Sequence, residues 1–238
     1  MPDRPCPRAA ADAQGLGERC GTQPRRRRAA SEAQPTAASE EAIVLVWLIA
    51  STWVVLYVSN HCLTIWATRL HQAHARDHFD FEGSYELNPV LQADVDRLRL
   101  VSPRFIVSLL LSATSIVGMW FLTASFLGTS VLFDVYAGTL VLPCLAMNVR
   151  HVRNLVLFTA IKVPGTIRGK IAYSRWIQWK LTAVDFLGFA GLFLVLGLLL
   201  KDWFLLGGTL SCAAHARQYW ALMKKSRPRV APAAEECA

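Results

Sequence analysis

From Arg104 to Arg150 the sequence reads RFIVSLLLSATSIVGMWFLTASFLGTSVLFDVYAGTLVLPCLAMNVR, with no charged residue between Phe105 and Phe133. A helix crosses a bilayer with about 20 predominantly apolar residues, so this stretch is long enough to cross twice. Gly128, Thr129 and Ser130 interrupt the apolar run with residues that favour a turn. We therefore expect a helical hairpin that lies in a membrane.

The charged residues of the chain avoid its apolar runs. Although 53% of the 238 residues are hydrophobic and the net charge is +8, nearly all charges gather in the two ends and in two loops. This segregation is typical of a membrane protein, because a charge at the bilayer centre costs at least a few kcal/mol. Lys and Arg beside membrane spans contact anionic lipids and set orientation. The expected partner is therefore the lipid bilayer, and no nucleic acid.

The fold class predicted from these runs is an all-α integral membrane protein with about five transmembrane helices. The N-terminal segment 1–41 lacks apolar periodicity and is expected to be a disordered tail. The membrane domain covers 42–223, and a flexible basic C-terminal tail covers 224–238. The expected spans are 42–68, 105–127, 131–149, 181–200 and 203–223, with a tight turn at Lys201 and Asp202 between the last two.

The first span ends in polar residues: Ser59, Asn60, His61 and Cys62 stand beside the apolar run. Polar residues late in a span usually mark a face turned toward other helices. We expect this end of the helix to pack inside the protein.

The two hairpins resemble each other at an offset of seventy residues. Residues 112–140 and 182–210 align without a gap, and Gly138-Thr139-Leu140 matches Gly208-Thr209-Leu210. Two explanations stay open, an internal repeat and the general composition of membrane helices. If the repeat is real, a first helix is followed by two similar parallel hairpins.

Orientation is predicted from the basic residues. Five spans place the loop near 70–103, the loop 150–180 and the C-terminus on one side, and most Lys and Arg residues lie there. Cytoplasmic loops carry such an excess. The C-terminus is therefore expected in the cytoplasm, although the Arg25–Arg28 run in the N-terminal tail argues for a four-span alternative with an inside N-terminus.

A candidate metal site lies in the loop after the first span. His71, His74 and His78 share one helix face if that helix continues, and two glutamates follow. Imidazole and carboxylate ligands suit a divalent metal such as Zn or Fe. The alternative is a solvated polar loop that binds nothing. The full candidate metal set is His71, His74, His78, Glu82 and Glu86.

A second candidate site consists of polar residues within or at the ends of the spans. An acid inside a span is a candidate proton or cation carrier, whereas one near a span end can simply be solvated. The candidate intramembrane polar site is Asp134, Asn148, His151, Asp185 and His215.

Three functions are compatible with these residues, and no catalytic motif such as G-x-S-x-G is present. The preferred hypothesis is a small membrane scaffold or subunit, not an enzyme, whose cytoplasmic loops meet a protein partner or a second copy. The first alternative is a transporter or channel for a cation or small solute that uses Asp134 and Asp185. The second is a membrane metalloenzyme centred on His71, His74 and His78.

Overall fold

The computed structural model describes residues 35–82, 91–163 and 169–226. By its contacts the chain separates into residues 1–42 and residues 43–238, and the helical bundle belongs to the second of these units. Of the described residues, 84% are helical, in agreement with the predicted all-α class. Of the expected tails, residues 1–34 and 227–238 lie outside the described residues.

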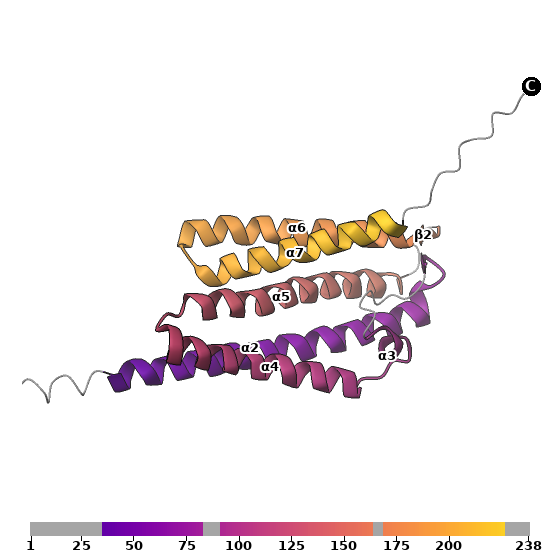
Figure 1. The fold of residues 1–238 in the computed structure, drawn as a ribbon. Coiled ribbons are helices and arrows are strands. Elements are labelled where there is room, and N and C mark those ends of the chain that lie inside the picture. The colour runs from indigo at the N-terminus through magenta and orange to yellow at the C-terminus, as the bar shows by residue number, and fades with distance from the viewer. Residues whose placement is uncertain (1–34, 83–90, 164–168, 227–238) are drawn as a thin grey trace, which may run out of the picture. The chain divides into compact units, whose positions relative to one another are not determined.

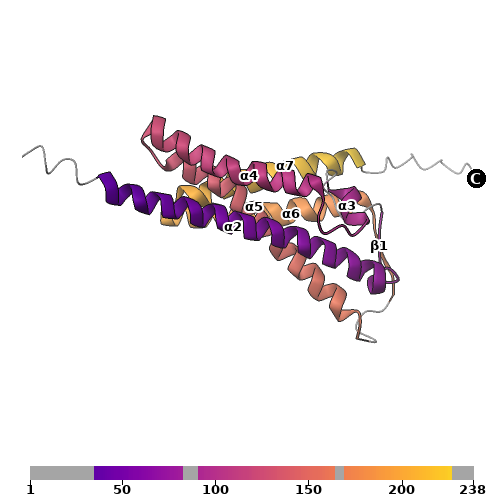
Figure 2. The ribbon, with the colours of Figure 1, turned by 90° about the horizontal axis from the view of Figure 1, so that it is seen from below.

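The described residues form five long helices that are joined by short elements and alternate in direction in both views (Figures 1 and 2). Two π-helical turns, η1 and η2, continue α2 and α4 without a break. In chain order the elements are α2 (Pro35–Leu70), η1 (His71–Ala75), β1 (Phe79–Phe81), α3 (Gln92–Asp96), α4 (Pro103–Leu122), η2 (Thr123–Leu127), α5 (Val131–Ala160), β2 (Ile171–Tyr173), α6 (Arg175–Leu200) and α7 (Trp203–Ser226).

The tight turns between α4 and α5 and between α6 and α7 lie where the sequence predicts them. Gly128 ends η2 in the left-handed region, with φ of 61°, which costs glycine little. Lys201 ends α6 with φ of 53°. The Asp202 carboxylate then accepts a hydrogen bond from the Phe204 backbone N–H at 2.8 Å and so caps α7.

Among the described residues, four helical stretches are long and apolar enough to cross a membrane: Glu40–Ala75, Pro103–Leu127, Val131–Ala160 and Arg175–Leu200. The expected fifth span, α7, does not meet that criterion, because His215, Arg217 and Gln218 make its second half polar. The outer surface of the apolar helices carries large aliphatic and aromatic side chains. Leu199, for example, is 74% exposed, whereas several polar side chains are buried.

A small parallel strand pair lies outside the long helices, and the sequence did not predict it. β1 pairs with β2 in the register Phe79↔Ile171, and Lys170 Nζ lies 3.4 Å from the Asp80 carboxylate. The pair satisfies backbone N–H and C=O groups of two loops that are far apart in sequence. It therefore joins the loop after α2 to the loop before α6.

The helix that contains the third expected span, 131–149, continues beyond it, because α5 ends at Ala160. Phe158 in this extension is 1% exposed and packs with Ala67 and Phe79. Burial of this aromatic side chain stabilises the extra turns of α5. The apolar segment 154–161 is too short to cross a membrane, so its length did not indicate that the helix continues through it.

Side-chain hydrogen bonds attach α4 to its neighbours. The Trp53 indole N–H donates to the Ser112 hydroxyl at 2.9 Å, and the Tyr136 hydroxyl donates to the Ser115 hydroxyl at 2.7 Å. These bonds hold α4 against α2 and α5.

α7 packs along both α5 and α6, and its approach to α5 depends on glycine. A Cβ atom on Gly138 would collide with the Phe204 backbone carbonyl, and one on Gly207 would collide with that of Val135. A Cβ atom on Gly208 would collide with the Leu142 side chain. Both members of the repeated Gly-Thr-Leu pattern therefore lie at this one crossing.

Replacing Gly138 with Ala should destabilise the protein by about 1–3 kcal/mol, because the new methyl group meets backbone rather than a movable side chain. Gly188→Ala is the matched control, since no described atom of another residue lies within 4 Å of a Cβ at that position. Thermal unfolding of both variants in detergent measures the difference. Equal transition temperatures for the two variants would contradict the close crossing.

Candidate functional site

A cavity of about 680 Å³ opens among α2, α3, α4, α5, α6 and α7. This volume falls in the range of ligand pockets. The lining residues come from all six helices, so the cavity exists only when the whole bundle is assembled. Among the described residues that line it, none is Asp or Glu.

α5 forms the floor of the cavity. Its lining residues recur at helical spacing, which places them on one face. Pro143 lies in the middle of this face and has no N–H to offer to the Thr139 carbonyl one turn earlier. The lining residues of α5 are Thr139, Leu140, Pro143, Cys144, Met147, Arg150 and His151.

An aromatic wall from α2 and α4 borders one side. The Tyr57 ring lies 5.2 Å from that of Trp53 and 5.4 Å from that of Phe105, measured between centroids. The His61 ring stacks on Phe105 with centroids 4.2 Å apart. Trp53, Tyr57 and His61 are spaced four residues apart, so their side chains lie on one face of α2.

A second aromatic wall comes from α6 and α7. Tyr219 stacks on Trp179 at 5.5 Å and on Phe186 at 5.7 Å, and His215 stacks on Phe186 at 5.1 Å. The Arg175 guanidinium lies 5.9 Å above the Trp179 ring, a favourable cation–π distance. This contact places a positive charge at the rim.

The cavity is apolar at one end and polar at the other. Along α2 the lining passes from Trp53 to Thr64, and along α5 it passes from Leu140 to Arg150. At 1.5 Å per helical residue, each of these paths is about 15 Å long. The polar end coincides with the end of the bundle where α4 and α6 begin.

Two buried histidines lie at the polar end. His61 and His151 are only 4% and 5% exposed. The His61 Nε2 atom lies 3.1 Å from the Leu100 carbonyl oxygen, which can only accept, so Nε2 carries the proton. His151 Nε2 lies 3.1 Å from the Thr64 hydroxyl, which already donates to the Asn60 carbonyl at 2.8 Å. In the neutral histidines both Nδ1 atoms are therefore acceptors.

Several polar atoms at this end are buried and have no hydrogen-bond partner within the described part of the chain. Those on residues that line the cavity are the Nδ1 atoms of His61 and His151, the Oδ1 atom of Asn60 and the Nη1 atom of Arg150. The Oδ1 atom of Asn148 and the Oδ2 atom of Asp94 are also buried and unpaired among the described residues, but their residues do not line the cavity. Because an unpaired buried polar group costs about 1–3 kcal/mol, such a concentration indicates a binding site.

The structure divides the predicted intramembrane polar site. His151 and His215 line the cavity, whereas Asn148 is buried beside it and donates to the Leu56 and Cys144 carbonyls at 3.0 and 2.9 Å. Asp134 lies in the first turn of α5 and is not among the lining residues.

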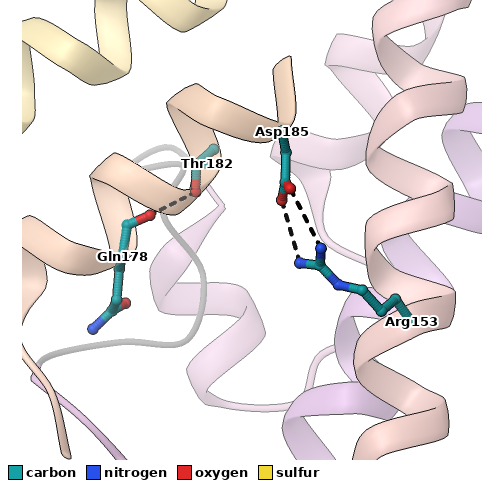
Figure 3. Close-up of polar contacts among 4 residues, drawn as sticks. All are labelled: Arg153, Gln178, Thr182 and Asp185. Carbon is teal, nitrogen blue, oxygen red and sulfur yellow. Dashed lines mark hydrogen bonds and ion pairs between the residues drawn. The ribbon is translucent and has the colours of Figure 1, made fainter. Parts of the chain in front are cut away.

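Asp185 is engaged elsewhere. Its carboxylate lies 3.2 Å from the Arg153 guanidinium, between α6 and α5 (Figure 3). The neighbouring Thr182 hydroxyl donates to the Gln178 carbonyl at 2.8 Å within α6. The structure therefore does not bring Asp134 and Asp185 into one polar cavity.

Three of the predicted metal ligands make hydrogen bonds with backbone groups. His71 Nε2 lies 2.8 Å from the Phe79 carbonyl, and His78 Nδ1 lies 3.1 Å from the Gly169 carbonyl. Glu82 accepts from the Arg175 N–H at 2.9 Å, and His74 is exposed. Among the described residues no three His, Cys, Asp or Glu side chains are grouped to hold a metal. Glu86 lies outside them.

The candidate sites predicted from the sequence did not include five residues that line the cavity: Asn60, His61, Thr64, Arg150 and Arg175. The signal for the first three was the polar end of an apolar span, which indicated an inward face but no ligand site. Arg150 and Arg175 belong to the basic loop, where most arginines are solvated. Only the packing of α4 and α7 against α5 places them on a common cavity.

Comparison of the chain with protein-family models, with curated proteins and with solved structures found no match. The cavity is therefore the feature from which a function can be inferred.

Replacing Thr64 with Val should lower the free energy of unfolding by about 1–3 kcal/mol, because the His151 Nε2–H loses its buried acceptor. Thr68→Val is the matched control on the same helix. Its hydroxyl donates to the Thr64 carbonyl at 2.8 Å, so its removal leaves no buried donor unpaired. Thermal unfolding that affects both variants equally would contradict the Thr64–His151 bond.

Proposed function

We propose that this chain is a multi-pass membrane protein. Four helices of sufficient length and apolarity support this proposal, together with an outer surface of large apolar side chains and an interior with polar groups. α7 completes the bundle as a fifth span that is shielded by α5 and α6. In this arrangement the basic loop before α6 and the end of α7 lie in the cytoplasm.

The proposed activity is the binding of an amphipathic small molecule in the cavity. The observation that carries it is the polarity gradient over about 15 Å along α2 and α5. Apolar side chains such as Leu140 and Phe186 suit a hydrocarbon chain, and the polar end suits a headgroup at the membrane surface. Few convergent polar groups in an otherwise apolar pocket are typical of ligand sites.

The test uses a photoactivatable single-chain amphiphile added to the purified protein in detergent. Crosslinks are expected on α5 between Thr139 and His151. Met147→Trp should reduce labelling about tenfold or more, because the larger side chain fills the cavity, where Met147 is half-buried.

Leu145→Trp is the matched control, since Leu145 is 39% exposed and lies on the outer face of α5. Its labelling should equal that of the unmodified protein. Labelling spread over the outer helix faces, and equally strong in both variants, would overturn the proposed function.

A scaffold or subunit role is the second candidate. The β1–β2 pair joins the loop after η1 to the loop before α6, and a joined loop surface is what a protein partner or a second copy would contact. Replacing Asp80–Phe81 and Ile171–Ala172 with Gly-Ser pairs should release such a partner. Co-purification that is unchanged by this replacement would remove the scaffold candidate.

A further inference from the structure

We infer that the ligand of the cavity carries an anionic headgroup with a neighbouring hydroxyl group, as in a lysophospholipid with a terminal phosphate. This inference rests on the proposed binding of an amphiphile and adds the chemistry of its headgroup. It depends on the charges and on the unpaired buried atoms at the polar end.

The anion is indicated by two arginines. Arg150 and Arg175 both line the cavity, and its described lining residues include no Asp or Glu to neutralise them. The Arg150 Nη1 atom is buried and has no hydrogen-bond partner among the described residues. A guanidinium presents fixed donors that match phosphate or carboxylate oxygens. A negatively charged headgroup would therefore supply what the site lacks.

The hydroxyl is indicated by atoms of opposite character. Where the chain is described, His61 Nδ1, His151 Nδ1 and Asn60 Oδ1 are buried, unpaired acceptors on residues that line the same cavity. A fully deprotonated anion has no proton to offer them. A hydroxyl on the headgroup donates to one of these acceptors while the anion accepts from Arg150. One ligand then pairs with Arg150 and with one of the three acceptors.

The geometry also disfavours a cationic headgroup. Arg150 and Arg175 both line the cavity, so a choline group would meet two positive charges there. A zwitterionic lipid with the same chain should bind more weakly than the anionic one. Repulsion between like charges of this kind provides discrimination between ligands.

The test compares four probes of equal chain length for displacement of the photoactivatable amphiphile. They are lysophosphatidic acid, an alkyl phosphate, a monoacylglycerol and lysophosphatidylcholine. Lysophosphatidic acid should bind tightest. Loss of the phosphate should weaken binding about tenfold to hundredfold, the equivalent of one hydrogen bond to a charged group, and loss of the hydroxyl should weaken it less.

Arg150→Gln should reduce the affinity for lysophosphatidic acid to that for the monoacylglycerol. Arg153→Gln is the control, because Arg153 is paired with Asp185 and does not line the cavity. If Arg150→Gln does not fold, the four probes on the unmodified protein decide alone. Equal affinities for all four would overturn the headgroup inference and leave amphiphile binding intact, whereas no binding of any probe would overturn both.

Discussion

The close approach of α5 and α7 is the contact on which the rest of the bundle depends. Gly138 lies against the Phe204 carbonyl, and Gly207 lies against the Val135 carbonyl, so the two backbones touch near the start of each helix. Such close contact supplies dispersion energy that holds the two helices together. α6 is then attached through its packing against α7.

The cavity is a consequence of this asymmetric packing. Glycine residues bring α5 and α7 together near the N-terminal end of each helix. Bulky rings on α2, α4, α6 and α7 line the cavity instead. There the helices enclose space instead of filling it. The walls are stiff because the rings stack on one another, and a preformed site lowers the ordering cost of binding. The Nδ1 atoms of His61 and His151 are buried beside the cavity and have no hydrogen-bond partner among the described residues.

Sequence patterns predicted the turns well and the contacts between segments that are distant in the sequence poorly. The turns at Gly128 and Lys201 were evident from breaks in apolar runs, since chain direction can reverse only where the backbone is free to bend. The extension of α5 to Ala160 was missed, because Phe158 is buried by residues from α2 and β1. The β1–β2 pair was missed for a similar reason, since three-residue strands carry almost no periodic signal.

By itself the sequence determined the all-helical class, the lengths of the apolar segments and the separation of charged residues from those segments. These features depend only on the composition of contiguous residues. Only the tertiary structure decided which polar residues act together. Asp185 is paired with Arg153 outside the cavity, whereas Arg150, three residues before Arg153, lines it with His61 of α2 and His215 of α7. The physical reason is that a binding site depends on distances between side chains from different helices, and helix packing sets those distances.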